Sequence, residues 1–466
     1  MRFDDNIILL TDSYKVGHYP QYPKGTEYVY SYFESREGSL FQDTTFFGLQ
    51  YILKRYFHAP SMRQVDEAAE LFRLHFGSDK LFNYEGWKYI AELGYLPVRI
   101  KAVPEGMTIP TRNVLMTIEN TDPKCFWLTN YLETLLVQVW YPSTVCTLSR
   151  ECKKMILRYL EKTGDPSLIN FKLHDFGFRG VSSVESAAIG GLAHLVNFRG
   201  GDTVPPLILA REYYDCRMAG FSIPASEHST MTSWNQDGEV DAMRNMIKTY
   251  SDYPLYACVS DSYDIYRACR EYWGGELKYD VLNGKGTLVI RPDSGTPHEV
   301  VLKCLDILGD KFGITINGKG YKVLHPKVRL IQGDGVDYFE IRNILAKMEV
   351  AGWSADNVAF GMGGGLLQKV NRDTQAFAFK ASSIIVNGFQ RDVFKQPITD
   401  SGKASKKGYQ SLIIKDGMYK TINKRDMVDD ILLEVYLNGK ITWEYTLDGI
   451  RERADHDLSE MFNNYR

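Results

Sequence analysis

Side chains that can do chemistry recur at the ends of short apolar runs in the middle of the sequence. Asp202 follows two glycines in VNFRGGDTV, His228 follows FSIPASE, and Asp261 lies in PLYACVSDSYD. Arg291 and Asp293 end the run GTLVIRPDSG. An aspartate accepts hydrogen bonds, a histidine can act as a base or accept a phosphoryl group, and the planar arginine fork suits phosphate. These residue types indicate an enzyme that acts on a phosphorylated substrate.

Two glycine clusters follow further apolar runs. IQGDGVD contains Gly333 and Asp334, and FGMGGGLLQK contains Gly363 and Gly364 ahead of a helical stretch. Glycine lets backbone N–H groups approach an anion closely, and the start of a helix adds a favourable field. The clusters favour a phosphate cradle, although a tight turn with a positive φ angle produces the same pattern.

Each of these side chains also has a structural interpretation. Asp202 is placed to cap the helix expected at PPLILAREYY, and a lone histidine such as His228 is as easily structural as catalytic. Arg291 with Asp293, and Arg372 with the aspartate after it in KVNRDTQ, would suit structural ion pairs at a domain edge. Neither a G-x-x-x-x-G-K-[ST] phosphate loop nor a G-x-S-x-G serine-hydrolase elbow is present, which disfavours those two enzyme classes.

The clusters are spaced like repeated strand–loop–helix units. They follow one another at roughly 25–40 residues, the length of one such unit, with helical stretches such as EVVLKCLDILGDKF between them. We therefore predict an α/β fold with a parallel sheet or a barrel over residues 151–385. The loops at the carboxyl ends of its strands would hold the active site.

The two ends of the chain, residues 1–150 and 386–466, are richer in strand-like runs. EYVYSYFES has the β-branched and aromatic content of a strand, and Asp-Gly and Asn-Gly pairs at 416–417 and 438–439 are typical of hairpin turns. We expect both ends to combine in a second, largely antiparallel β-rich domain.

Composition excludes several classes of protein. The 466 residues carry a formal net charge of −3, without the basic excess of proteins that bind nucleic acid or membrane surfaces. No apolar run is long enough to span a membrane, and aspartates interrupt the N-terminus where a signal peptide would be apolar. The seven cysteines form no C-x-x-C pair, which favours reduced thiols in a cytoplasmic protein over a zinc site or disulfides.

The ordered motifs resemble the nicotinamide phosphoribosyltransferase family, within the type II phosphoribosyltransferases, over nearly the full chain. They include TDSYKVGHY, YSYFESRE, KAVPEGM, ENTDPKCFWLTNYLET, KLHDFGFRGVSS, HLVNFRGGDTV, PASEHST, VSDSYDIY, IRPDSG, LIQGDGVD and GGGLLQK. The resemblance implies transfer of phosphoribose from 5-phosphoribosyl-1-pyrophosphate (PRPP) to nicotinamide, giving nicotinamide mononucleotide and pyrophosphate. It also implies Mg²⁺, an ATP hydrolysis coupled through a phosphohistidine, and a homodimer with active sites at the subunit interface. The fold that it implies is an irregular, TIM-like α/β barrel with an added β-rich domain, which agrees with the division of the chain expected above.

By this resemblance, Phe176 and Tyr14 of the other subunit sandwich the pyridine ring. Arg179 contacts the ring or its carboxamide, Asp202 accepts a hydrogen bond from the amide, and His228 is the phosphorylated histidine. The resemblance assigns the remaining residues to ribose, phosphates and metal, with Mg²⁺ held mainly by pyrophosphate near Asp261 or Asp293. These residues are Asp261, Arg291, Asp293, Gly333, Asp334, Gly363, Gly364 and Arg372, together with the basic residues Arg36, Lys380 and Lys395.

Two positions depart from the family pattern, and two other functions remain as alternatives. Met362 stands where the family often has serine, and Phe178 where it often has tyrosine. A nicotinate phosphoribosyltransferase would share the fold and the phosphate machinery, but a carboxylate at Asp202 would repel the acid substrate. A non-catalytic binding or signalling protein on the same scaffold is the other alternative.

Overall fold

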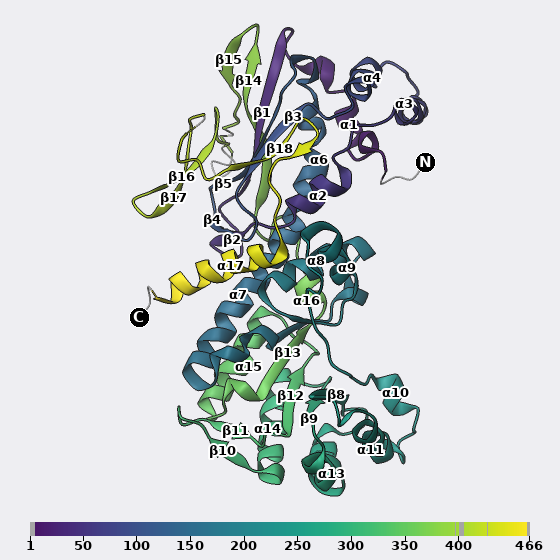
Figure 1. Ribbon diagram of the computed structural model, residues 1–466, viewed down its shortest axis with the longest axis vertical. Coiled ribbons are helices and arrows are strands. Elements are labelled where there is room, and N and C mark those ends of the chain that lie inside the picture. The colour runs from purple at the N-terminus through teal and green to yellow at the C-terminus, as the bar shows by residue number, and fades with distance from the viewer. Residues whose placement is uncertain (1–4, 397, 400–404, 426, 464–466) are drawn as a thin grey trace. The chain divides into compact units, whose positions relative to one another are not determined.

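The computed structural model describes residues 5–396, 398–399, 405–425 and 427–463 (Figure 1). The chain forms two compact units, each considered separately below. The first comprises Met1–Thr147, Glu212–Asp215 and Asn371–Arg466, and the second comprises Leu148–Arg211 and Cys216–Val370. The division falls within the long helix α7 (Trp140–Thr163).

A six-stranded parallel sheet forms the centre of the second unit, and its strands follow the order β7-β6-β13-β12-β9-β8. The strands are β6 (Leu173–Asp175), β7 (Gly200–Gly201), β8 (Leu255–Val259), β9 (Thr287–Arg291), β12 (Val328–Gln332) and β13 (Val358–Met362). Short runs such as TLVIR and VRLIQ are rich in β-branched and other apolar residues and are mostly buried, as expected for parallel strands covered by helices.

An extended segment, residues 221–226, joins the two edges of this sheet. Phe221 forms a parallel bridge with Gly200 of β7, and Ala225 forms one with Ala257 of β8. The segment therefore curls the sheet into an irregular barrel. Inside it, Ala257, Val289 and Ile331 pack together, with the partly buried Phe176, Ile223 and Ala359 against them.

Helices surround the barrel strands (Figure 1). They are η5 (Pro166–Phe171), η6 (Phe178–Gly180), α8 (Val184–Asn197), α9 (Pro205–Tyr214), α10 (His228–Thr232), α11 (Glu239–Tyr250), α12 (Ile265–Arg267), the π-helix η7 (Ala268–Glu276), α13 (Lys278–Asn283), α14 (Pro297–Phe312), α15 (Tyr338–Val350), η8 (Ala355–Asn357) and α16 (Gly364–Leu367). A small hairpin of β10 (Ile314–Ile316) and β11 (Lys322–Leu324) adjoins them. Because the barrel strands are parallel, the loops after all of them lie at one end.

The first unit contains a seven-stranded antiparallel sheet in the order β15-β14-β1-β5-β3-β18-β19. Its strands come from both ends of the chain: β1 (Thr26–Ser35), β3 (Val98–Ala102), β5 (Val114–Asn120), β14 (Phe377–Val386), β15 (Phe389–Asp392), β18 (Leu433–Leu437) and β19 (Lys440–Ile441). Two further ladders pair β2 (Asp43–Thr45) with β4 (Thr108–Pro110), and β16 (Ser411–Lys415) with β17 (Met418–Ile422). The predicted α/β fold with a barrel and a separate antiparallel β-rich part is confirmed.

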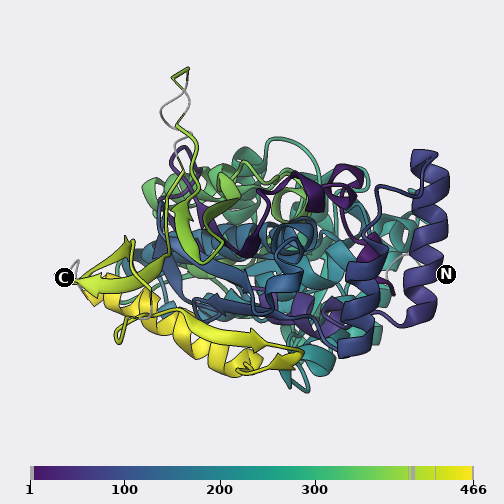
Figure 2. The same cartoon turned by 90° about the horizontal axis from the view of Figure 1, so that it is seen from above.

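The helices of the first unit are mostly short, and α3 and α4 lie side by side at its edge in both views (Figures 1 and 2). They are η1 (Ile7–Leu9), α1 (Ser13–Val16), η2 (Tyr19–Gln21), α2 (Leu49–Tyr56), α3 (Met62–Phe76), α4 (Tyr84–Leu93), η3 (Pro123–Cys125), α5 (Leu128–Tyr131), α6 (Glu133–Leu136), η4 (Val137–Val139) and α17 (Leu447–Asn463). Across the described part of the chain, no helix combines the length and apolar character that crossing a membrane requires.

The barrel closure can be tested at Ser226. Its buried hydroxyl accepts the N–H of Val259 at 3.0 Å and donates to Sγ of Cys258 at 3.6 Å. Ser226→Ala leaves the buried Val259 N–H without its acceptor, so we expect the free energy of unfolding to fall by about 1–3 kcal/mol. Urea denaturation measures this. The control Ser233→Ala, at the exposed end of α10, should change the free energy of unfolding by less than about 0.5 kcal/mol. Equal effects of the two variants would contradict the role of Ser226 in fixing the segment to β8.

Candidate active site

A cavity of about 640 Å³ opens among the loops at the carboxyl ends of the barrel strands. It is lined by Phe176, Phe178, Arg179, Gly180, Asp202, Thr203, Arg291, Asp293, Gly333, Asp334, Gly363 and Gly364. The structure thus brings together nine of the predicted residues, from the loops after β6, β7, β9, β12 and β13. Phe178, at the position that departs from the family pattern, also lines the cavity and is exposed.

Phe176 is held by a backbone hydrogen bond, and its ring packs against two glycines. The backbone N–H of Phe176 donates to the carbonyl of Met362 at 3.0 Å. A Cβ atom at Gly361 would lie 1.9 Å from the ring, and one at Gly333 would lie 3.1 Å from it. The guanidinium of Arg291 lies 5.6 Å from the ring centroid. Gly361 is therefore required to make room for an aromatic surface, a steric role that the phosphate-cradle interpretation did not foresee.

Asp202 follows β7 and is fixed by two hydrogen bonds. Its N–H donates to the carbonyl of Asp175 at 2.9 Å, and the hydroxyl of Ser222 donates to its Oδ1 at 2.6 Å. Helix α9 begins at Pro205, so Val204 precedes the helix and Asp202 does not occupy the cap position. Its carboxylate lines the cavity with one oxygen engaged by a hydroxyl.

A chain of charged side chains continues from the cavity to His228. Arg291 donates from Nε and Nη2 to Oδ1 of Asp293, at 3.0 and 2.7 Å. Nε2 of His228 lies 2.9 Å from Oδ1 of Asp261, and its Nδ1 lies 3.9 Å from Oδ2 of Asp293. His228 is 45% exposed, whereas the Asp261 side chain is 4% exposed. Arg291 and Asp293 do form the ion pair of the structural interpretation, and they form it in the wall of the cavity.

The glycines after β12 and β13 differ in whether the backbone conformation requires a glycine. Gly335 has a positive φ angle of 65°, which fits the tight-turn interpretation. Gly333, Gly363 and Gly364 are not among the positive-φ residues. A Cβ at Gly364 would meet no heavy atom within 4 Å. Neither backbone strain nor packing therefore requires a glycine at position 364.

Four predicted basic residues gather in the first unit, around Lys380 of β14. Burial lowers the pKa of half-buried Lys380, and the positive charges of Lys395, Arg36 and Arg372 lower it further, while Glu133 opposes them. Four basic side chains that lie close enough to influence one another form a cluster suited to phosphates.

Tyr14, the other predicted residue of the first unit, lies on α1. Its side chain is 64% exposed, with the ring edge-on to that of His18 at a centroid distance of 4.8 Å. An exposed aromatic ring on a short helix is available for contact with a ligand or with another copy of the chain.

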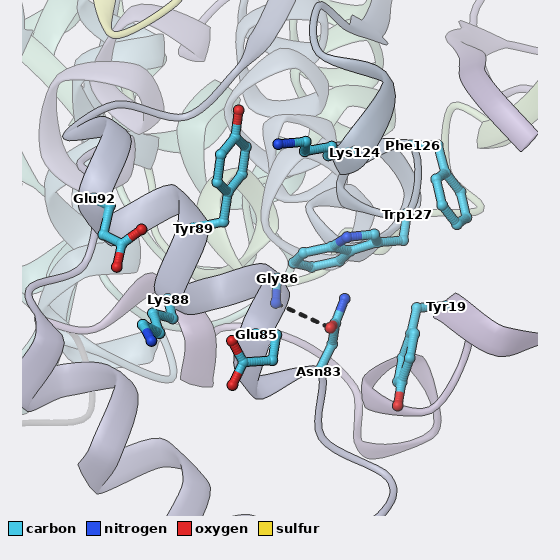
Figure 3. Close-up of a pocket in the computed structure, with 10 residues that line it drawn as sticks. All are labelled: Tyr19, Asn83, Glu85, Gly86, Lys88, Tyr89, Glu92, Lys124, Phe126 and Trp127. Carbon is cyan, nitrogen blue, oxygen red and sulfur yellow. Dashed lines mark hydrogen bonds between the residues drawn. The ribbon is translucent and has the colours of Figure 1, made fainter.

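The first unit also has a separate cavity of about 430 Å³, shown in Figure 3. Aromatic and charged side chains of α4, η2 and the η3 region surround it, including Tyr89, Trp127 and Lys124. The amino group of Lys124 lies 4.5 Å from the centroid of the Tyr89 ring, and the Tyr89 hydroxyl donates to Asp122. None of the residues predicted for catalysis or substrate binding lines this cavity.

Three polar residues of the site were not predicted: Asp175, Thr203 and Ser222. Asp175 is buried at the end of β6, where burial raises the pKa of its carboxyl to about 6 and the Asp202 charge adds to the effect. The position of Asp175 at a strand end, like that of Asp202, is the sequence signal that would have found it. Ser222 offers no such signal, because its role depends on a contact 20 residues away.

The carboxylates fit a magnesium ion held mainly by substrate. Asp261 faces His228 and Asp293 faces Arg291, and no group of three or more candidate metal ligands occurs among the described residues. Magnesium is often bound by one or two carboxylates together with substrate phosphates and water. Asp261 and Asp293 suit that arrangement better than a metal site built from protein ligands alone.

Two family models match the chain. The model of the nicotinate phosphoribosyltransferase family matches residues 171–440, and that of the nicotinamide phosphoribosyltransferase N-terminal domain matches residues 6–100. The chain is 50% identical to a nicotinamide phosphoribosyltransferase of Xanthomonas campestris pv. campestris, with 98% of this chain and 99% of the relative aligned. It is 34% identical to the enzyme of the same name from Acinetobacter baylyi, over 99% of each chain.

Solved structures share the fold at low sequence identity. The nicotinate-nucleotide pyrophosphorylase of Pyrococcus furiosus matches with a TM-score of 0.60 at 15% identity, over 99% of this chain and 98% of its own. Human nicotinic acid phosphoribosyltransferase matches with a TM-score of 0.59 at 14% identity, over 97% of this chain and 94% of its own.

The steric role of Gly361 is testable. We expect Gly361→Ala to displace the Phe176 ring and to lower the free energy of unfolding by about 1–3 kcal/mol through overpacking. The control Gly364→Ala, where a Cβ has open space, should leave stability and ring position unchanged. Thermal unfolding and a crystal structure of each variant measure both effects. A Gly361→Ala protein with unchanged stability and an unmoved ring would refute the assignment.

Proposed function

The chain belongs to the nicotinate phosphoribosyltransferase family, and on that premise we propose that it transfers phosphoribose from PRPP to nicotinamide, forming nicotinamide mononucleotide and pyrophosphate. One observation carries the proposal. The barrel cavity combines an aromatic surface at Phe176, a carboxylate at Asp202 and an arginine at Arg291 on one rim. These groups match the flat ring, the carboxamide and the phosphates of the two substrates.

The pyridine ring would lie against Phe176, with its amide N–H donating to Asp202. An aromatic face suits a flat heterocycle. The engagement of one Asp202 oxygen by Ser222 orients the carboxylate. Arg179, which also lines the cavity, would contact the ring or the carboxamide oxygen. The structure is thus compatible with a neutral amide and unfavourable for a carboxylate at the same place.

The reaction needs positioning and charge stabilisation more than proton transfer. N1 of nicotinamide attacks the anomeric carbon of the ribose, forming the new C–N bond while the C–O bond to pyrophosphate breaks. N1 carries no proton, so no base is required. Arg291 and the backbone N–H groups at Gly333, Gly363 and Gly364 would hold phosphate groups at the barrel. In the first unit, the cluster of Arg36, Arg372, Lys380 and Lys395 is a further candidate for phosphate contacts. Magnesium bound to pyrophosphate would neutralise charge on the leaving group.

We further propose that the active enzyme is a homodimer in which Tyr14 of one copy completes the ring sandwich of the other. The exposure of Tyr14 supports this, because its ring is open to a partner. All seven cysteines are buried and none is in a disulfide, which supports the proposal of a cytoplasmic location, where thiols remain reduced.

The geometry at His228 supports a coupled ATP hydrolysis. Because a carboxylate only accepts hydrogen bonds, a neutral His228 ring that donates to Asp261 across the 2.9 Å contact carries its proton on Nε2 and its lone pair on Nδ1. Nδ1 would then attack the γ-phosphorus of ATP and release ADP, and water would later take the phosphoryl group. The phosphohistidine would place negative charge beside the phosphate site.

A nicotinate phosphoribosyltransferase and a non-catalytic protein are the competing functions. Pyrophosphate release by the purified protein with PRPP and Mg²⁺ separates them. We expect release with nicotinamide and little with nicotinate. Equal efficiencies would support a nicotinate or dual-specificity enzyme, and complete inactivity of the folded protein would support the non-catalytic alternative.

Asp202→Ser should shift the preference towards nicotinate. Removal of the negative charge removes the repulsion of the acid, so the ratio of the kcat/KM for nicotinamide to that for nicotinate should fall at least about tenfold, or about 1.4 kcal/mol. Asp237→Ser, at an exposed aspartate of the same unit, is the control and should keep the wild-type ratio. An unchanged ratio in Asp202→Ser would rule out Asp202 as the selecting residue.

His228→Ala should abolish the enhancement by ATP while leaving measurable basal transfer. The variant has no nitrogen to phosphorylate, whereas the attack of nicotinamide on PRPP does not need a base. Initial rates of pyrophosphate release with and without ATP measure the effect, with the exposed His58→Ala as control. Full ATP enhancement in His228→Ala would disprove the phosphohistidine.

A further inference from the structure

We propose that Asp175 is a positioning residue of this site, which holds the Phe176 loop and the Asp202 loop at the separation that a pyridine carboxamide requires. This inference rests on the proposed function, because it assigns Phe176 and Asp202 to the ring and to the amide. Asp175 itself does not line the cavity. It would act through the two residues that do.

Hydrogen bonds connect Asp175 to both loops. Its side-chain Oδ1 accepts the N–H of Gly177 at 2.7 Å, which fixes the turn directly after Phe176. Its backbone carbonyl accepts the N–H of Asp202 at 2.9 Å. Asp175 is also paired in register with Gly201, the residue before Asp202. One residue thus sets the place of the aromatic surface and of the amide acceptor.

The surroundings of the Asp175 side chain leave it little freedom. The residue is 2% exposed, and a Cβ atom on Gly191 of α8 would lie 2.9 Å from its Oδ2. A larger residue at position 191 would therefore push the carboxyl group out of place. The glycine on α8 permits the close approach of the helix that keeps Oδ1 on Gly177.

The buried carboxyl group is retained despite an unfavourable environment. Oδ2 of Asp175 and Oγ1 of Thr203, the residue after Asp202, are both buried, and hydrogen bonding between the two side chains lowers the pKa of the Asp175 carboxyl against the larger, opposite effect of burial. Burying a polar group is costly unless hydrogen bonds offset the cost. A packing role alone would be filled as well by an apolar side chain, whereas acceptance of the Gly177 N–H requires an oxygen at this position.

The rest of the cavity is held by different contacts. The Arg291–Asp293 pair lies at the end of β9, Gly333 follows β12, and Gly363 follows β13. The hydrogen bond of the Asp175 side chain goes to Gly177 and not to any of these residues. Loss of Asp175 should therefore impair the binding of nicotinamide much more than that of PRPP, a split that general loosening of the fold would not produce.

Two substitutions test the inference. Asp175→Ala removes the acceptor of the Gly177 N–H, and we expect the KM for nicotinamide to rise at least tenfold while the KM for PRPP changes less than threefold. Asp175→Asn keeps an acceptor oxygen in the same place, and its amide can donate to the neighbouring Thr203 hydroxyl. We expect it to keep the KM for nicotinamide within threefold of the wild-type value.

The matched control is the pair Glu105→Ala and Glu105→Gln in the first unit. Glu105 is 1% exposed, and its carboxyl group accepts the N–H of Gln50 at 2.7 Å, so it resembles Asp175 in burial and bonding. Neither control variant should change the ratio of the two KM values. Wild-type activity is measured first, since failure to use nicotinamide would refute the proposed function and not the role of Asp175.

With an active wild type, three outcomes would overturn the inference. They are an unchanged nicotinamide KM in Asp175→Ala, a parallel rise of both KM values, and an Asp175→Asn variant that folds but loses nicotinamide binding as fully as the alanine variant. If Asp175→Ala does not fold, Asp175→Asn decides alone: a nicotinamide KM raised more than threefold contradicts the inference, and a value within threefold supports it.

Discussion

Closure of the parallel sheet is the constraint on which the site depends. The extended segment at residues 221–226 pairs with β7 on one side and with β8 on the other. Because β7 and β8 are the two edge strands of the six-stranded sheet, this segment joins the edges and closes the sheet. Without it, Asp202 and His228 would lie at opposite edges of an open sheet. With it, the loops after β7 and β8 become neighbours of the same segment, and Ser222 within it reaches Asp202 directly.

The closed barrel separates two chemical environments along its rim. On the side of β6 and β7, Phe176 offers an aromatic surface and the carboxylate of Asp202 offers a hydrogen-bond acceptor. On the side of β8 and β9, Arg291 offers a cation, with His228 between two aspartates. A neutral donor group is favoured on the first side and an anion on the second. A substrate pair composed of an uncharged amide and a pyrophosphate ester fits this division.

Part of this arrangement was predictable from sequence and part was not. Parallel barrel strands carry their functional residues at their carboxyl ends, so Asp202, His228 and Arg291 could be selected from the pattern of apolar runs. The same reasoning missed Asp175, because nothing in a single sequence shows which strand-end carboxylates turn inward and become buried. It also left the requirement for Gly361 unexplained, since the ring that needs the space lies 185 positions away by residue number (Phe176 to Gly361). The basic cluster around Lys380 joins segments near residues 36, 372 and 395, and only resemblance to a family pointed to it.

The ion pair between Arg291 and Asp293 has a consequence for turnover. The guanidinium already donates two hydrogen bonds to an internal carboxylate, so an anion entering the cavity meets an arginine whose charge is partly compensated. The affinity for a phosphate group would therefore be lower than at an unpaired arginine, for product as well as for substrate. If pyrophosphate binds at Arg291 as proposed, Asp293 compensates the arginine after the product has left. The internal carboxylate would thus ease the release of a multiply charged product.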